Sequence, residues 1–323
     1  MILVLTDHPR IDDEGEILSS NRIFSSLLDS AAIDRGNITI LAAINVRPHM
    51  DRIESVLTRS KALRAKSLPP FRSGFFVPAS LEARIKSVKR QIEKLSPDVI
   101  IALGPFSLWV LTGHYDISRR HGFIHAFGRI PVIPAYHPAT IVRQYSFFLP
   151  TAGDFARANA LATGLIRPEK FDYIAEPTLD DLSAFVRFVN ENPQAPISID
   201  IETRPTYRSI VSIGLGTSNK ALCVQLWNRS RKGQSFWPSP QQEQQALEHV
   251  ANVMASPNPK IMQNALYDLM ILATGPNLRV HGPITDTRLQ HLALYNEIPH
   301  NLAEIATGHL AMQPWKSDHK APK

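Results

Sequence analysis

Two acidic residues lie within a run of β-branched residues in the segment ISIDIET, residues 197–203. In an extended strand, successive side chains point to opposite faces, so the three isoleucines would share one face and Asp200 and Glu202 the other. Two carboxylates at that spacing repel each other unless a cation lies between them, and Mg²⁺ prefers oxygen ligands of this kind. The pattern therefore predicts a divalent-metal site, whereas the alternative is a strand with a solvated polar face.

A third acid stands in QNALYDLMIL, residues 263–272, which has the pattern of a helix. Asn264 and Asp268 are four residues apart, so a helix would place them on one face, with Leu269 and Leu272 turned toward the core. An aspartate among so many apolar residues is costly unless it is paired or bound to a metal. The alternative is an acid that the helix dipole favours in the first turn.

In the amino-terminal half, the segment YHPATIVR places a histidine directly after a predicted strand. Pro138 would force a turn after His137, and Arg143 follows nearby, so this loop could press a histidine and backbone amides onto a nucleic acid. The alternative is a histidine on the rim of an α/β sheet.

Between residues 59 and 90 the chain is rich in basic residues and has one acid, Glu82. Such a cluster could follow a phosphate backbone, or it could be a solvated helix face joined to a mobile loop. Its members are Arg59, Lys61, Arg64, Lys66, Arg72, Arg84, Lys86, Lys89 and Arg90.

The elements that must position these residues form two α/β patterns. Strands alternating with helices predict a mostly parallel sheet with helices on both faces in the first pattern. Strands followed by helices predict a mixed sheet in the second. The first pattern has strands at 2–6, 37–46, 98–104 and 130–138 and helices at 21–33, 80–95, 106–113 and 153–165. The second has strands at 197–203, 210–217, 220–227 and 260–264 and helices at 178–192, 240–255, 265–275, 287–296 and 301–311.

Length and composition agree with this division. A chain of 323 residues suggests two domains, because single cores stop growing at roughly 250–300 residues. We expect domains at 1–165 and 178–323, joined by a linker at 166–177 that contains prolines and has no clear period. The formal charge of +6 fits a polyanionic partner.

Cysteine usage and hydropathy exclude several classes of protein. Cys223 is the single cysteine, so the chain cannot form an internal disulfide framework or a four-cysteine iron–sulfur cluster. No apolar stretch approaches the roughly 20 residues that span a bilayer, and the first residues read as a strand and not as a signal peptide. We therefore expect a soluble cytoplasmic protein without a membrane partner.

The segments ISIDIET, MQNALYDLMIL and ITDTRLQHLALYNEIPHNLAEIAT together resemble the 3′–5′ proofreading exonuclease domain of family A DNA polymerases, over about residues 177–314. That domain belongs to the DEDD exonucleases and has a ribonuclease H-like fold. The resemblance implies that Asp200, Glu202 and Asp268 are three of the four acidic metal ligands. It also implies that Asn264 is a nucleic-acid-binding residue of the second motif.

The same resemblance implies hydrolysis of a phosphodiester with two Mg²⁺ or Mn²⁺ ions about 4 Å apart. Asp200 would bridge the ions, Glu202 would hold the ion that activates water, and Asp268 would help to hold the other. The expected partner is DNA with a single-stranded 3′ end.

The family's third motif is a Tyr or a His followed by the fourth Asp on a late helix. This chain ends in AMQPWKSDHKAPK, where Asp318 is the late acid and has no correctly spaced Tyr before it. We therefore expect the amino-terminal part of a phage-type family A DNA polymerase, truncated before the last motif, with the polymerase domain downstream in cis. Such a fragment would be a poor exonuclease at best.

Residues 1–165 resemble the uracil-DNA glycosylase superfamily through LVLTDHP, NVRP, VIIALG, LTG and YHPA. The resemblance implies that Asp7 positions the hydrolytic water and that His137 contacts the flipped uracil. Three features depart from the family: the loop after the first strand reads Thr6-Asp7-His8-Pro9-Arg10, Ala42 replaces an expected Asn, and the four cysteines of the cluster are missing. A pocket that cannot satisfy the polar edge of the base loses most of its discrimination, so we expect a degenerate domain that binds DNA or docks a protein.

The resulting prediction is an α/β protein of DNA replication, with a glycosylase-like parallel-sheet domain followed by an incomplete ribonuclease H-like exonuclease domain. If it is phage-encoded, it would act in the cytoplasm of the bacterial host. Two alternatives remain: a DNA-binding accessory protein without catalysis, and an RNA-processing DEDD exonuclease.

Overall fold

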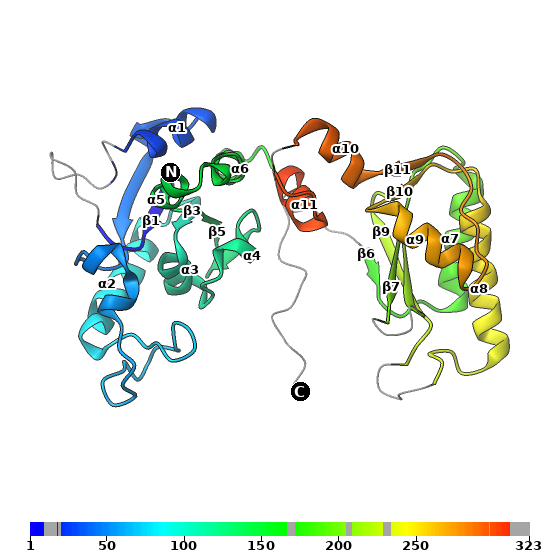
Figure 1. Cartoon of the computed structure of the whole chain (residues 1–323), viewed down its shortest axis with the longest axis horizontal. Helices are drawn as coiled ribbons and strands as arrows, with labels where there is room; N and C mark the ends of the chain where they lie inside the picture. Colours follow the sequence, from blue (N-terminus) through cyan, green and yellow to red (C-terminus); the bar gives the residue numbers. More distant parts are fainter. Residues whose placement is uncertain are drawn as a thin grey trace. The chain divides into compact units, whose positions relative to one another are not determined.

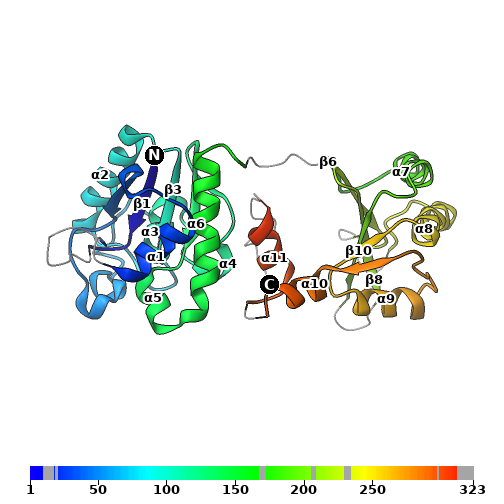
Figure 2. The same cartoon turned by 90° about the horizontal axis from the view of Figure 1, so that it is seen from above.

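The structure is a computed structural model that describes residues 1–9, 18, 21–166, 172–204, 209–228, 234–296 and 298–310. The chain divides into two compact units (Figures 1 and 2). Unit 1 comprises Met1–Glu169, Glu297–Pro299 and Ala303–Lys323, and unit 2 comprises Lys170–Asn296 and His300–Leu302. Arg10 and Asp318, to which the sequence drew attention, lie outside the described residues.

Unit 1 is built on a five-stranded sheet in the order β2-β1-β3-β5-β4. The first four strands of this order run parallel, and β4 pairs antiparallel with β5 at the edge. The strand β1, with sequence ILVLT, is buried along its whole length, as expected for a strand covered on both faces. The strands are β1 (Ile2–Thr6), β2 (Ile38–Ala42), β3 (Val99–Leu103), β4 (His125–Phe127) and β5 (Ile130–Ala135).

Helices cover both faces of this sheet (Figure 2). Leu3 and Leu5 pack into a core with side chains of α2 and α3, whereas Ile2 and Val4 pack into a second core with side chains of α1 and α6. Because successive side chains point to opposite faces, β1 contributes residues to both cores. The helices of unit 1 are α1 (Arg22–Ser30), α2 (Ala79–Leu95), α3 (Pro105–Thr112), α4 (Ile117–Arg120), α5 (Pro138–Arg143), α6 (Phe148–Ala162) and, from Ala303 onward, α11 (Leu302–His309).

Unit 2 contains a mixed six-stranded sheet in the order β11-β10-β7-β8-β9-β6. The strands β7, β8 and β9 pair antiparallel in sequence, while β10 runs parallel to β7 and β11 parallel to β10. The edge strand β6 pairs parallel with β9. The strands are β6 (Asp172–Ile174), β7 (Ile197–Thr203), β8 (Ile210–Gly216), β9 (Lys220–Gln225), β10 (Lys260–Met262) and β11 (Ile284–Asp286).

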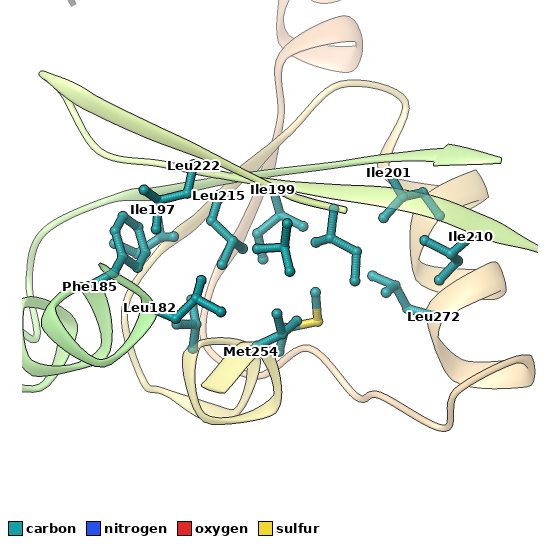
Figure 3. Close-up of a cluster of buried hydrophobic side chains, with 14 of the residues drawn as sticks. Leu182, Phe185, Ile197, Ile199, Ile201, Ile210, Leu215, Leu222, Met254 and Leu272 are labelled. Carbon is teal, nitrogen blue, oxygen red and sulfur yellow. The ribbon is translucent and has the colours of Figure 1, made fainter. Parts of the chain in front are cut away.

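One face of this sheet carries the core of unit 2 (Figure 3). The isoleucines of β7 pack there against Leu182 and Phe185 of α7 and against Met254 of α8. The helix α7 begins with a capping box, in which the Thr178 hydroxyl accepts from the amide of Asp181 at 3.2 Å and the Thr178 amide donates to the Asp181 carboxylate at 2.9 Å. The helices of unit 2 are α7 (Leu179–Glu191), α8 (Pro240–Ala255), α9 (Ala265–Thr274) and α10 (Thr287–Leu294).

A fully buried lysine anchors the start of β10. The ammonium group of Lys260 donates to the carbonyl oxygens of Ser256 and Asn258, both at 2.9 Å, and of His281 at 3.0 Å. A buried charge is tolerated only with such partners, and these carbonyls belong to the loop before β10 and the loop before β11. Lys260 therefore holds those two loops together.

The predicted fold class is confirmed: both units are α/β, and the second sheet is mixed. The short strands β4, β6 and β11 were not predicted, because three residues are too few to show a period. One of them, β6, lies inside the stretch 166–177 that the sequence suggested as a linker. Residues 303–310, predicted within the second domain, belong to unit 1.

Within the described part of the chain, none of the helices has the length and apolar character that crossing a bilayer requires.

Replacement of Lys260 by Met keeps most of the side-chain volume but removes the donor from three buried carbonyls. We expect the free energy of unfolding to fall by about 2 kcal/mol, because each unsatisfied buried acceptor costs about 1–3 kcal/mol while the desolvation of the charge is relieved. Urea denaturation followed by circular dichroism measures this change. The exposed Lys94→Met is the control, and an unchanged midpoint for Lys260→Met would show that the lysine does not anchor the loops.

Candidate functional site

The strand β7 presents its acids on the face opposite the core. Its side chains alternate strictly from Ile197 to Glu202, with the isoleucines buried and Ser198, Asp200 and Glu202 exposed. Asp200 lies opposite Gly214 of β8, and Glu202 lies opposite Ser212. The neighbouring strand therefore adds no bulky side chain at Asp200 and no charge at either position.

Asp268 is the buried member of the predicted set. It lies in the first turn of α9, and 4% of its surface is exposed. Burial, followed by the charges of Asp200, Glu202 and Asp286, raises the pKa of Asp268 to about 7. The fold thus brings Asp268 within electrostatic reach of both strand acids, which the sequence pattern alone did not establish.

A fourth acid, Asp286, fixes the position of α9. Its carboxylate accepts hydrogen bonds from the backbone amides of Asn264 at 3.1 Å and Ala265 at 2.9 Å, and from Arg288 and Leu289 at the start of α10. Burial alone would raise the pKa of Asp286, but these backbone hydrogen bonds outweigh it and lower the pKa. Asp286 is therefore an ionised group that caps two helix starts and adds negative charge near Asp268.

Sequence reasoning missed Asp286, although a signal was present. An aspartate directly before a helical pattern, as in ITDTRL, is a typical N-cap. What the sequence could not show is that the same carboxylate also caps α9, whose first residue is far away in the chain.

The placement of Asn264 differs from the prediction. It was expected on the same helix face as Asp268, but it precedes α9 and has a left-handed backbone, with φ of 60°. Its side-chain oxygen accepts a hydrogen bond from the Arg288 guanidinium at 2.7 Å. An asparagine tolerates this conformation better than most residues, so it suits the sharp turn from β10 into α9.

A side-chain contact links α9 to the end of β7. The hydroxyl groups of Thr203 and Tyr267 lie 2.7 Å apart. Tyr267 immediately precedes Asp268, and Thr203 immediately follows Glu202. This hydrogen bond therefore ties the two acid-bearing elements together beside their carboxylates.

The chemistry of the donor set fits a hard divalent cation. Three carboxylates supply only oxygen donors, and the charges of Asp200, Glu202 and Asp286, which together with burial raise the pKa of Asp268, are ones that a cation would neutralise. Among the residues that the structure describes, however, no three His, Cys, Asp or Glu side chains converge closely enough to hold a metal ion as they stand. A bound metal would require the strand acids to turn toward Asp268.

In unit 1, Asp7 follows β1 and lies against the start of α3. Its carboxylate accepts hydrogen bonds from the Ser107 amide at 2.7 Å and the Ser107 hydroxyl at 2.8 Å. Burial raises the pKa of Asp7 to about 6, although both hydrogen bonds oppose the shift. At Gly104, which has φ of +106°, a Cβ atom would lie 2.6 Å from the Asp7 carboxylate, so glycine is needed for this close approach.

The loop of His137 lies beside the loop that follows β1. The rings of His8 and His137 stack with centroids 6.5 Å apart, and the Nδ1 atom of His137 accepts from the Ala139 amide at 3.1 Å, which caps α5. Arg143 is exposed and donates to the Ala139 carbonyl of its own helix at 3.1 Å. His137 thus joins Asp7 in one region, whereas Arg143 is engaged within α5.

Two members of the predicted basic cluster are engaged within unit 1. Lys86 pairs with Glu82 on α2, and the Arg84 guanidinium donates to the Ala42 carbonyl at 2.7 Å. Its remaining described members include Arg59 and Arg72, which belong to the loops before α2.

Those loops line an open cavity of about 450 Å³. Both Arg59 and Arg72 hold a guanidinium 4.8 Å from the centroid of the Phe75 ring, and Arg72 pairs with Glu54 at 2.8 Å. The charge of Glu54, which lines this cavity, is one of the causes that raise the pKa of Asp7. The lining residues are His49, Met50, Arg52, Glu54, Ser55, Leu57, Arg59 and Phe75.

The uracil DNA glycosylase superfamily matches residues 2–161. Unit 1 contains a domain of this superfamily. The glycosylase superfamily domain thus accounts for β1 to β5 and for α1 to α6, and it includes Asp7 and His137. No curated protein matches the sequence of the chain.

Solved structures of nucleases share weaker similarity with the chain. Escherichia coli RNase D is 17% identical over 43% of this chain and 32% of its own, with a TM-score of 0.29. The EXO domain of Aedes aegypti Nibbler is 16% identical over 41% and 61%, with a TM-score of 0.28. Brucella melitensis NrnC with bound Mg²⁺ is 16% identical over 49% and 70%, with a TM-score of 0.29. The chain spans about a third of RNase D and less than two thirds of the Nibbler domain.

Replacement of Asp268 by Asn should stabilise the metal-free protein at alkaline pH. Because the folded state raises the pKa from 3.8 to about 7, the native state binds this proton more tightly than the unfolded state, and stability falls as pH rises through that range. Asn carries no charge and removes the repulsion. We therefore expect the free energy of unfolding to increase by an amount on the order of 2 kcal/mol at pH 8 and to change little near pH 4.

Thermal melts in EDTA at the two pH values measure this difference, with Asp29→Asn on α1 as the control. An equal effect at both pH values, or a lower melting temperature at pH 8, would contradict the electrostatic origin of the shift.

Proposed function

We propose that unit 2 is a metal-dependent exonuclease domain that hydrolyses phosphodiesters at 3′ ends. The observation that carries this proposal is the buried Asp268 carboxyl group beside the charges of Asp200 and Glu202. Burial of a carboxyl group against two others lowers stability, and sites that bind a cation accept such a cost for function.

Each of the three acids would have its own role. Asp200 and Glu202, which are exposed on β7, would hold the ions from the solvent side, and Asp268 would supply a ligand from the protected side. When bound, two Mg²⁺ or Mn²⁺ ions would activate water and stabilise the leaving oxygen. Tyr267, held by Thr203, would keep α9 in place beside the strand acids.

The parent protein and the substrate that we propose rest on the resemblance of the motifs. The order of ISIDIET and MQNALYDLMIL supports the proofreading domain of a phage-type family A DNA polymerase, with single-stranded DNA ends as the substrate and the polymerase domain in cis. Its place of action would be the cytoplasm. RNA processing is the second possibility for the same site, since the three acids do not distinguish the two nucleic acids.

A change of Asp200 to Ala should abolish Mn²⁺-dependent cleavage of a 3′-labelled single strand by the chain. It should also weaken Mn²⁺ binding by about tenfold or more, because loss of a ligand exceeds the effect of losing a supporting group. Both can be measured on the same protein, by gel assay and by calorimetry. Asp180→Ala, at the exposed start of α7, is the matched control.

Two results would contradict the proposal. One is cleavage that persists in Asp200→Ala and Asp268→Ala. The other is Mn²⁺ binding to the wild-type chain that neither change weakens. Comparison of DNA and RNA substrates of equal sequence then separates proofreading from RNA processing.

For unit 1 we propose nucleic-acid binding without efficient uracil excision. The observation in its favour is the open cavity that Arg52, Arg59 and the aromatic ring of Phe75 line. Arginines and aromatic rings together bind phosphates and stacked bases. Ala42 lacks the side-chain amide that could bind the edge of uracil.

Replacement of Arg59 by Ala should weaken single-stranded DNA binding and reduce the slope of log K against log salt by about one. Fluorescence anisotropy at several salt concentrations measures both, with the exposed Lys94→Ala on α2 as control. An unchanged slope would show that the cavity does not bind phosphate, and clear uracil release from a uracil-containing strand would refute the loss of excision.

A further inference from the structure

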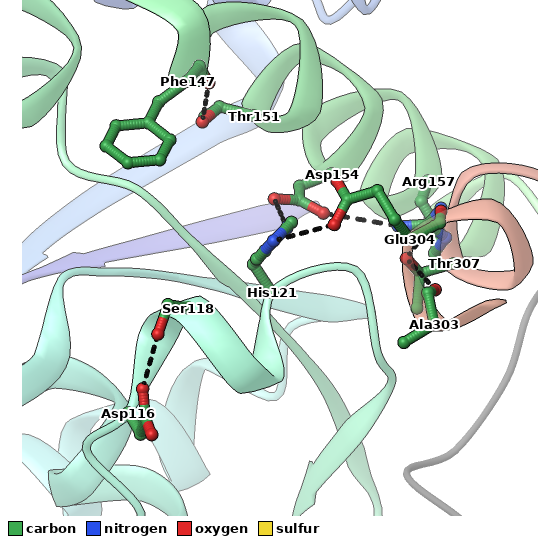
Figure 4. A network of polar contacts seen from close by, with 10 residues as sticks. All are labelled: Asp116, Ser118, His121, Phe147, Thr151, Asp154, Arg157, Ala303, Glu304 and Thr307. Atoms are coloured by element: carbon green, nitrogen blue, oxygen red, sulfur yellow. Dashed lines mark hydrogen bonds and ion pairs between the residues drawn. The ribbon is translucent and has the colours of Figure 1, made fainter. Parts of the chain in front are cut away.

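The helix α11 packs against the glycosylase superfamily domain, although unit 2 separates the two in the sequence (Figure 4). The chain leaves unit 1 before β6, and the residues of α11 from Ala303 onward belong to unit 1 again. Neither of the proposed activities uses the residues of this contact.

Four ionisable side chains meet there. The two ring nitrogens of His121 lie 3.6 Å from the Asp154 carboxylate and 3.5 Å from the Glu304 carboxylate. Arg157 pairs with the other oxygen of Asp154 at 3.4 Å. The exposed fractions of Asp154, Arg157 and His121 are 1%, 7% and 9%, and the Glu304 side chain is 15% exposed, so three members of the cluster are buried and the fourth is partly buried.

The backbone beside His121 is shaped to accept the helix. Gly122 has φ of +80°, and a Cβ atom there would lie 2.5 Å from the Cβ of Thr307. Thr307 is buried, and its hydroxyl donates to the Ala303 carbonyl within α11 at 2.8 Å. Glu304 and Thr307, three residues apart on one helix face, therefore contact His121 and Gly122 together.

We propose that this surface of unit 1 is a proton-controlled docking site for α11, which binds while His121 carries a positive charge and is released when His121 loses it. The partner is a segment of the same chain, and the recognised features are a carboxylate and a small β-branched residue one turn later.

The charge count supports this proposal. With His121 protonated, two positive groups, His121 and Arg157, face the carboxylates of Asp154 and Glu304, and the neutral imidazole removes one of these two charges. Removing a charge partner from carboxylates shielded from water is costly. The other titratable group that faces His121 is Tyr136, whose ring centroid is 5.0 Å away and whose burial raises its pKa, so it stays neutral.

The pKa directions agree with the geometry. Burial by itself lowers the pKa of His121, but the hydrogen bond and charge of Asp154 and the charge of Glu304 outweigh it, so the pKa is raised. Burial also raises the pKa of Glu304. The stabilisation by His121 is therefore fully present below its ordinary value near 6.5 and is lost as pH rises through its higher folded value.

Hydrogen exchange of the full chain tests the docking. We expect the amides of 303–310, corrected for intrinsic exchange with the unstructured peptide at each pH, to be protected several-fold more at pH 6 than at pH 8.5. Glu304→Gln should abolish or invert this dependence, since it removes one carboxylate, and His121→Asn should abolish it. Glu93→Gln, exposed on α2, is the control and should behave as wild type.

Equal protection of 303–310 at both pH values in the wild-type chain would overturn the proposal without any variant. A wild-type pH dependence that persists in Glu304→Gln or His121→Asn would also overturn it. Circular dichroism of each variant shows whether the rest of the chain remains folded.

Discussion

The repulsion among carboxylates at β7 and α9 is the constraint on which the arrangement of unit 2 depends. Asp268 is buried against the charges of Asp200 and Glu202, and its pKa rises to about 7 as a result. A fold that keeps such a group must hold α9 against β7 by other means. The capping of α9 by Asp286 and the hydrogen bond between Tyr267 and Thr203 are those means.

This arrangement is typical of a site built for a ligand and not for stability alone. A helix with no functional role would be more stable with an apolar residue or an exposed acid at position 268. A bound cation, by contrast, would turn the repulsion among the carboxylates into attraction. The isoleucines of β7 make the arrangement possible, because they anchor the strand in the core and leave its other face to the acids.

In unit 1, by contrast, a buried acid is stabilised by hydrogen bonds. The Asp7 carboxylate is satisfied by Ser107, and Gly104 leaves room for it, so the loop after β1 is held firmly against α3. The charge cluster around His121 is held differently, since it is completed by a helix from the far end of the described chain. One domain therefore contains both a locally fixed acid and a long-range contact that depends on charge.

Much of this architecture could be predicted from local patterns. The alternation in ISIDIET placed the isoleucines inside and the acids outside, and the apolar runs located β1, β3 and the longer helices, because period and burial are properties of neighbouring residues. The candidate acids and the histidine of the YHPA loop also came from the sequence. That Asp200, Glu202 and Asp268 act as metal ligands stays a prediction.

Only the tertiary structure decided which distant residues meet. Asp286 caps α9 as well as α10, Asn264 leaves the helix to make a left-handed turn, and β6 joins the edge of the second sheet. The packing of α11 on unit 1 is the clearest case, because no local period links Glu304 to His121. Residue types and spacing determine the faces of each element, but the partner of each face depends on contacts between segments far apart in the chain.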